Sequence, residues 1–284
     1  MKLDPPPAES DAQAAILEPM RRQARSLKGG LIYVSQVHPG IAHAVSRVCS
    51  FMAKPTEQSY TAAKRILAWL RDRSDLGCTY GRPHLRSLED LIPSQDPFPP
   101  MHDSRDFALT CTVDSDLSSR SLPLLSDVDA KPADRNASRS QLGYEFSLAG
   151  ACFEACSRRQ HSVAVNTAVA ELFAASTAAA ILITINGVLR FVTFGILGVQ
   201  PVVFWCDNEI CITVAKDASS MKHVAYVARR VRFLQEMQSS DHRIISMRKV
   251  SGLANPADML TKHLKKKSFK LYAAKLYGCS PADL

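Results

Sequence analysis

Hydrophobic and polar positions divide the chain into stretches of different pattern. Between residues 29 and 81 the apolar residues recur at helical spacing and predict two helices, one with Ile41, Val45, Val48 and Met52, the other with Tyr60, Ala63, Leu67 and Leu70. Residues 1–28 show no periodic pattern and predict a flexible leader. Residues 82–106 are rich in Pro, Asp and Ser, which favours a linker or a surface insertion.

From residue 107 onward the pattern alternates between strands and helices. The predicted strands are 107–113, 142–148, 152–158, 201–206 and 243–250, and predicted helices begin near residues 167, 208, 222 and 255. The run VVFWC at 202–206 is apolar on both faces, which is typical of a central strand in a covered sheet. The pattern therefore predicts an α/β layered domain over residues 107–284.

One apolar run, residues 177–198, has the length of a membrane span. It contains Asn186, Gly187 and Arg190 and lacks flanking basic loops, so a buried helix is favoured and no membrane partner is expected. The N-terminus has no apolar core of a secretory signal, and the eight cysteines are scattered. We therefore expect a reduced, intracellular setting, either the cytoplasm or the nucleus.

The amino-acid composition limits both the class of protein and the kind of partner that it can bind. Hydrophobic residues make up 46% of the 284 residues, which excludes a disordered tail or a collagen-like fibre. Lys and Arg number 35 against 27 Asp and Glu, and this surplus fits a polyanionic partner. Taken alone, the basic residues around the second predicted helix, Lys64, Arg65 and Arg71, indicate an ordinary solvated face.

Three carboxylates in the second half of the chain stand out by position. Glu171 lies about one turn into the long predicted helix, in a stretch that carries no other charge, so its side chain is held against an apolar layer. Asp207 directly follows the apolar strand, where open α/β sheets place their active residues. Asp258 falls in the first turn of the last helix, after Asn255 as N-cap and Pro256.

Each of these carboxylates taken singly has an ordinary explanation as a helix cap, a dipole partner or half of an ion pair. Together, three carboxylates at the ends of elements in one α/β domain form the oxygen ligand set that Mg²⁺ requires. Two such ions clamp the attacking water and the leaving oxygen when a phosphodiester is hydrolysed.

A further Asp is expected from the first strand, and the sequence offers two. Asp114 ends the alternating run FALTCTV, whereas Asp127 follows SLPLL, in which Pro123 would remove a hydrogen-bond donor from a central strand. Strand quality therefore favours Asp114, and both remain candidates.

Several blocks occur in an order that is similar to one known family. They are LIYVSQVHPG at 31–40, SRSQLGY at 138–144, SRRQHSVAVNTAVAEL at 157–172, WCDNEICITVAKD at 205–217, KHVAYVARRVRFLQE at 222–236 and NPADMLTK at 255–262. From about Gly29 onward the chain resembles the C-terminal part of the Pol polyprotein of copia-type LTR retrotransposons, which is the tail of the reverse transcriptase followed by its ribonuclease H domain.

This resemblance implies a fold and an activity. The fold is ribonuclease H-like, a mixed five-stranded sheet flanked by helices, preceded by a small helical connection region at 29–81. The implied activity is hydrolysis of the RNA strand of RNA–DNA hybrids with two Mg²⁺ ions, or Mn²⁺ in their place. The implied ligands are Asp114 or Asp127 together with Glu171, Asp207 and Asp258.

The resemblance also implies the partners: an RNA–DNA hybrid or another nucleic acid, and the polymerase portion of Pol. With a nucleic-acid partner implied, several basic residues become candidates for contacts with phosphates, namely Lys64, Arg65, Arg71, Arg229, Arg230 and Lys262. The chain departs from the family at Val169, where a Glu is common, and lacks the polymerase's catalytic Asp pair. A degenerate or domesticated remnant that binds nucleic acid without cutting is therefore the alternative function.

Overall fold

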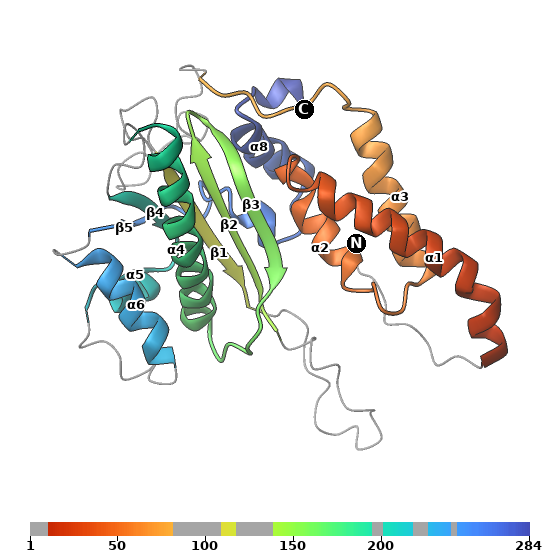
Figure 1. Ribbon diagram of the computed structural model, residues 1–284, viewed down its shortest axis with the longest axis horizontal. Coiled ribbons are helices and arrows are strands. Elements are labelled where there is room, and N and C mark those ends of the chain that lie inside the picture. Colours follow the sequence, from red (N-terminus) through yellow and green to blue (C-terminus); the bar gives the residue numbers. More distant parts are fainter. Residues whose placement is uncertain (1–10, 82–108, 118–138, 195–200, 218–226, 240–242) are drawn as a thin grey trace.

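A mixed sheet of five strands organises the protein, which we describe from a computed structural model over residues 11–81, 109–117, 139–194, 201–217, 227–239 and 243–284 (Figure 1). The strands are β1 (Thr110–Asp116), β2 (Gln141–Leu148), β3 (Ala151–Arg159), β4 (Val202–Cys206) and β5 (Ile245–Lys249). Their order is β3-β2-β1-β4-β5. β1, β2 and β3 are antiparallel neighbours, whereas β4 is parallel to both β1 and β5. The α/β class and the mixed five-stranded sheet are thus confirmed.

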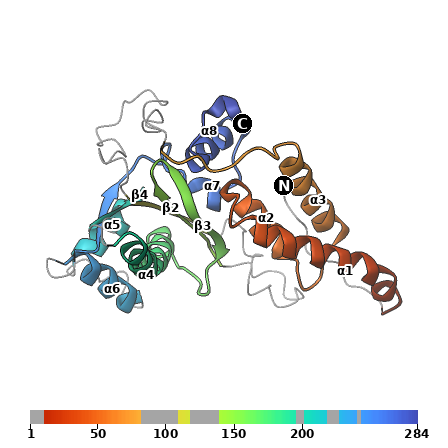
Figure 2. The same cartoon turned by 45° about the horizontal axis from the view of Figure 1, so that its top comes forward.

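Three helices cover one face of this sheet, namely α4 (Thr167–Val192), α5 (Glu209–Lys216) and α6 (Ala228–Gln238) (Figure 2). Their apolar sides and the inner face of the strands form the largest core, in which Phe146, Phe204 and Leu172 are fully buried. On the opposite face lie the short helix α7 (Asp258–Thr261) and α8 (Lys266–Tyr277), followed by the 3₁₀ turn η5 (Pro281–Asp283). The sheet is therefore covered on both faces, as its apolar central strand predicts.

The N-terminal helices pack beside β3 and form a core of their own. They are α1 (Asp11–Val34), the 3₁₀ turn η1 (Pro39–Ile41), α2 (Ala42–Cys49) and α3 (Glu57–Arg71). Leu31, Val45, Val48 and Ala63 are buried in this core. α3 begins at a capping box, in which the Thr56 hydroxyl accepts from the backbone N–H of Ser59 and the Ser59 hydroxyl accepts from that of Thr56.

One prediction for this region is wrong. Residues 11–28 are helical, whereas the sequence predicts a flexible leader. Pro19, Gly29 and Gly30 lie within α1 and interrupt its helical sequence pattern. Packing of Leu31 against α2 and α3 stabilises the helix. Leu67 is 48% exposed, because the buried side of α3 runs through Ser59, Ala62 and Ala63. The predicted linker at 82–106 lies outside the described residues.

The long apolar helix α4 divides into two halves. Most of its first half, including Leu172, Ala175 and Ala178, is buried against the sheet. The second half exposes apolar side chains, with Phe191 83% exposed. The buried helix predicted for residues 177–198 is therefore found only in part, since Ala178, Ala179, Leu182 and Asn186 are its buried members among the described residues. α4 is long and apolar enough to cross a membrane by length and composition, but 67% of its most apolar window is buried inside the protein.

Candidate metal centre

The strand order brings distant carboxylates to one end of the sheet. Asp114 lies near the carboxyl end of β1, and Asp207 follows the last residue of β4. Because β1 and β4 are adjacent and parallel, their carboxyl ends lie side by side. Glu171 reaches this point from the first turns of α4, and Asp258 from the start of α7, which packs on β1 and β2. Four carboxylates from four separate segments thus converge.

The carboxyl groups are close enough to share a cation. Asp114, Asp207 and Asp258 each offer an oxygen, and these oxygens lie within 4.8 Å of one another. Glu171 forms a second group with Asp207 and the thiol of Cys206 at the same separation. Asp207 belongs to both groups, so the two sets of ligands adjoin each other. Among the described residues, this is the place where acidic side chains gather at metal-binding distance.

A lysine lies within the first of these groups. The ammonium of Lys262 is 3.2 Å from Asp114 Oδ1 and 2.7 Å from Asp258 Oδ1. The hydroxyl of Thr261 donates to the other oxygen of Asp114. The Asp114 side chain is 1% exposed, so its charge is balanced by Lys262 rather than by water.

Glu171 is the most enclosed member of the cluster. Its Oε1 accepts a hydrogen bond of 3.0 Å from the backbone N–H of Ser115, next to Asp114. Its Oε2 is buried and has no hydrogen-bond partner among the described residues. Burial, and then the nearby Cys206, Asp114 and Asp207, raise the pKa of Glu171 well above its ordinary value. An unsatisfied, buried carboxylate oxygen is costly for stability, which fits a ligand position.

The other carboxylates show the same crowding. Burial followed by repulsion from Asp114 raises the pKa of Asp258 to about 7, although Lys262 acts in the opposite direction. The same two causes raise the pKa of Asp207. Burial disfavours the charge of Lys262, but Asp114 and Asp258 outweigh it and raise the pKa of this lysine. A divalent cation in this position would relieve the repulsion among the carboxylates.

Neighbouring residues hold the cluster together. The side-chain amide of Asn255 donates to the backbone oxygen of Val113 at 2.9 Å, and its oxygen accepts from the backbone N–H of Ala257. Asn255 therefore ties the loop before α7 to β1, whereas the sequence predicts a simple N-cap. Gly143 faces Asp114 across the β1–β2 ladder, and a Cβ there would lie 2.7 Å from Leu260 Cβ and 2.8 Å from Thr261 Cγ2. The missing side chain lets α7 approach the sheet.

Asp207 has no capping role in the helix that follows it. The N-cap of α5 is Asn208, whose side chain accepts from the backbone N–H of Cys211 at 3.0 Å. The ammonium of Lys249 on β5 donates to the backbone oxygen of Asp207. The Asp207 carboxylate is therefore left to the cluster.

The structure places four of the five predicted carboxylates at this centre. These are Asp114, Glu171, Asp207 and Asp258, and the alternative first-strand residue, Asp127, lies outside the part of the chain that the structure describes. The sequence does not reveal the contributions of Cys206 and Thr261 or the central position of Lys262. The NPADMLTK block contains Thr261 and Lys262, but their meeting with Asp114 depends on the approach of α7 to β1.

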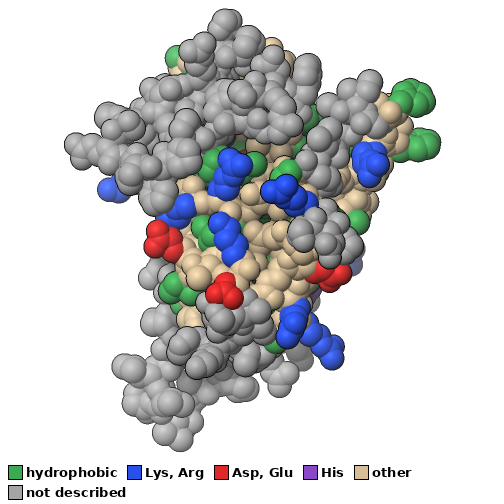
Figure 3. Space-filling model, turned by 90° about the vertical axis from the view of Figure 1, so that its left-hand side faces the viewer, with side chains coloured by type: hydrophobic (Ala, Val, Ile, Leu, Met, Phe, Trp, Pro, Cys, Tyr) green, Lys and Arg blue, Asp and Glu red, His purple; other side chains and the backbone are tan. Residues whose placement is uncertain are grey.

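The predicted phosphate contacts are spread over the molecule. Lys262 lies at the carboxylates, whereas Lys64, Arg65 and Arg71 lie on α3, and Arg229 and Arg230 lie on α6 at the other side of the sheet (Figure 1). Arg71 pairs with Asp72, and Arg230 stacks over the Phe173 ring at 4.7 Å and donates to Ser176. On the side that Figure 3 shows, Lys and Arg side chains are more widespread than Asp and Glu.

Known proteins resemble this chain over most of its length. It is 27% identical over 247 residues to the retrovirus-related Pol polyprotein from transposon TNT 1-94 of Nicotiana tabacum. It is 26% identical over 255 residues to the retrovirus-related Pol polyprotein from transposon RE1 of Arabidopsis thaliana. The chain is thus similar to Pol polyproteins of plant transposons. The resemblance seen in the motif blocks is thereby confirmed.

The shared region is a small part of these Pol polyproteins. The matches cover 87% and 89% of the chain but only 16% and 14% of the two relatives. A third relative, the Pol polyprotein from transposon RE2 of Arabidopsis thaliana, is 24% identical over 255 residues. No protein-family model and no solved structure matches the chain.

Proposed function

We propose that the protein is a ribonuclease H-type endonuclease that hydrolyses the RNA strand of RNA–DNA hybrids with divalent cations. The observation that carries this proposal is the meeting of Asp114, Asp207 and Asp258 within 4.8 Å, from three segments far apart in the chain. Glu171 adds a fourth carboxylate with an unsatisfied oxygen. The similarity to Pol polyproteins points to nucleic acid as the substrate.

The ligand set suits Mg²⁺, or Mn²⁺ in its place. Asp114, Asp207 and Asp258 would hold one ion, and Glu171 with Asp207 would hold a second, all through oxygen atoms. Hydrogen bonding with Cys211 and burial raise the pKa of Cys206 well above its ordinary value, so its thiol stays protonated and is a poor ligand for a hard cation. When bound, two such ions supply the electrostatic stabilisation of the attacking and leaving oxygens.

Lys262 has two roles in this proposal. Without metal its ammonium neutralises Asp114 and Asp258, the carboxylates that a metal ion would share. If these carboxylates held a divalent cation, the ammonium of Lys262 would no longer be needed there and could contact a phosphate of the substrate. Lys262 is partly exposed, with 36% of its side chain accessible, so it can turn outward without breaking the core.

A hybrid duplex is the substrate we propose, and its recognition would depend on shape and phosphates more than on base sequence. The basic residues on α3 and α6 remain proposed contacts for its backbone. The polymerase portion of a Pol polyprotein is a proposed partner, and an intracellular location follows from that assignment.

The deciding experiment is a cleavage assay on a labelled RNA–DNA hybrid, with the matched RNA–RNA and DNA–DNA duplexes as controls. With Mg²⁺ the protein should cut the RNA strand of the hybrid, and EDTA should stop the reaction. Asp207→Asn should lower the rate by about 10²–10³-fold, the usual loss when one electrostatic group at a reacting centre is removed. Equal inactivity of both folded proteins would instead support a remnant that does not cut.

A further inference from the structure

The second half of α4 and the turn after it carry a patch of exposed apolar side chains. Fifteen large hydrophobic side chains are exposed among the described residues, and six of them lie within residues 181–194. These six, which we call the α4 patch, are Ile181, Ile183, Val188, Phe191, Val192 and Phe194. Single exposed apolar side chains are ordinary on a protein surface, whereas a group of them in one place marks an interaction site.

The helix period explains why the sheet cannot cover this patch. Leu182 and Asn186, four residues apart, lie on the side of α4 that faces the sheet, and both are buried. Ile181, Val188 and Val192 are spaced by seven and four residues, so they share another side of the helix, and all three are exposed. α4 is therefore apolar around its circumference, which is typical of a helix that is covered on more than one side.

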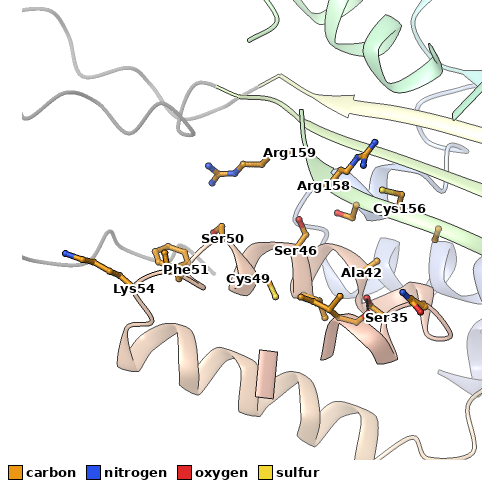
Figure 4. A pocket seen from close by; sticks show the side chains of 16 residues that line it. Ser35, Ala42, Ser46, Cys49, Ser50, Phe51, Lys54, Cys156, Arg158 and Arg159 are labelled. Atoms are coloured by element: carbon orange, nitrogen blue, oxygen red, sulfur yellow. Dashed lines mark hydrogen bonds between the residues drawn. The ribbon is translucent and has the colours of Figure 1, made fainter. Parts of the chain in front are cut away.

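Charge limits what can cover the α4 patch. Residues 177–194 contain a single charged residue, Arg190, although the chain has a net charge of +8. Two copies of so basic a protein repel each other over most of their surface. The groove between α2 and β3 is an example, because Lys54 and Arg159 are in its lining (Figure 4). The α4 patch lacks this repulsion and suits an apolar partner.

A membrane fits the patch poorly. The exposed part of α4, residues 181–192, is about 18 Å long, whereas the hydrocarbon core of a bilayer is about 30 Å thick. A helix that lies on a membrane surface carries several Lys and Arg along its polar side. In this part of α4 the one basic residue is Arg190, and the opposite side of the helix packs on the sheet.

The size of the patch matches what a dimer needs. A fully covered aromatic side chain buries about 150–250 Å², so Phe191 and Phe194, which are 83% and 95% exposed, together offer about 350 Å². The four aliphatic side chains bring the patch to roughly 600 Å² per copy. Two copies would thus bury roughly 1,200 Å², the lower end of the range for specific protein interfaces.

We propose that the α4 patch is an interface for a second copy of this chain, which contributes the same patch around a two-fold axis. An uncharged apolar patch is complementary to itself, as such an interface requires. The proposal does not depend on the proposed nuclease activity. Glu171 lies 20 residues before Phe191 on α4, which is about 30 Å along the helix, so the dimer leaves the carboxylates open.

The test measures the mass of the chain in solution against its concentration by analytical ultracentrifugation. The wild type should change from monomer to dimer in the micromolar range, because the interface is small. Phe191→Glu places a charge in the apolar interface and should weaken association about 100-fold. The control is Tyr33→Glu, which makes the same kind of change at a 74% exposed aromatic residue near the end of α1 and should have no effect.

Three results would overturn the proposal. They are a wild type that remains monomeric at about 100 µM, a dimer that persists in Phe191→Glu, and an equal loss of association in Tyr33→Glu. Thermal unfolding of dilute, monomeric protein checks that Phe191→Glu is folded, and its Tm should equal that of the wild type because the side chain is exposed.

Hydrogen exchange locates the interface. Backbone amides of residues 181–194 should exchange more slowly as the wild-type concentration rises, and those of Phe191→Glu should not. Slower exchange in another element, with none in α4, would place the interface elsewhere and contradict the proposal.

Vesicle flotation tests the other occupant. Neither neutral nor anionic vesicles should carry the wild type, whereas flotation that is lost in Phe191→Glu would show that the patch binds a membrane instead of a second copy. The cleavage assay stays separate from these tests. A wild type that cuts the hybrid as a monomer refutes the dimer alone, and a dimer that does not cut refutes the nuclease alone.

Discussion

Two buried carboxylates lie two residues apart along the β1–β2 ladder, and their surroundings differ. Glu145 faces Thr112, whose hydroxyl donates to Oε1 at 2.9 Å, and Ser147 donates to Oε2. Asp114 instead faces Gly143 and is surrounded by Lys262, Asp207 and Asp258. Both side chains are buried, but Glu145 has neutral donors on each oxygen, whereas Asp114 belongs to a group of like charges.

The contrast shows that burial alone does not mark a functional carboxylate. Burial raises the pKa of Glu145, and hydroxyl donors complete its hydrogen bonds. At the cluster, repulsion adds to burial, and one oxygen of Glu171 has no partner among the described residues. A structural and a functional carboxylate therefore differ in the groups that surround them, and four predictions test this difference.

The largest effect on stability is expected when the cluster loses its lysine. Lys262→Met leaves Asp114 without its cation, and we expect the free energy of unfolding to fall by about 2 kcal/mol, less than for a fully buried pair because Lys262 is partly exposed. Thermal unfolding without metal measures this loss, and Lys265→Met, an exposed neighbour, is the control.

Metal should reverse that loss. Mn²⁺ at about a hundred times its dissociation constant stabilises a protein by about 2.7 kcal/mol, and the wild-type Tm should rise by roughly 5–10 °C. Lys262→Met should bind Mn²⁺ more tightly in calorimetry and gain more in Tm, because no ammonium competes for Asp114 and Asp258. An identical Mn²⁺ affinity in the two proteins would contradict the competition between lysine and metal.

A smaller effect is expected from filling the space beside Asp114. Gly143→Ala puts a Cβ within 3 Å of Leu260 and Thr261, and we expect a loss of about 1 kcal/mol in unfolding free energy as α7 shifts. Because α7 carries Asp258, Mn²⁺ affinity should fall as well. Gly187→Ala on α4 is the matched control, since a Cβ there meets nothing within 4 Å and should leave stability unchanged or raised.

The smallest effect concerns Glu145 and pH. Its pKa in the folded protein is raised above its unfolded value, so the folded state holds this proton more tightly. Stability from this group is therefore full below the unfolded pKa and falls as pH rises through the folded pKa. Glu145→Gln should remove this part of the decline and raise the free energy of unfolding near neutral pH. If the free energy of unfolding changed with pH in the same way in the variant and the wild type, this explanation of Glu145 would be wrong.

The sequence by itself determined the local elements and several of the ligands. Strand β4 is apolar on both faces, so its place inside the sheet, away from both edges, and the position of Asp207 at its end were predictable. Glu171 was the one charge in an apolar helical stretch, which already implied a buried carboxylate. Both signals are local, because they depend on the order of neighbouring side chains.

Tertiary structure decided which distant segments meet. The parallel pairing of β1 and β4 brings Asp114 beside Asp207. The missing side chain at Gly143 lets α7 pack closely on the sheet, which places Asp258 and Lys262 beside them. Packing also stabilised α1 despite its proline and glycines and left the end of α4 exposed. Local pattern could not determine these outcomes, because charge repulsion, ion pairing and burial depend on distances through space between residues far apart in the chain.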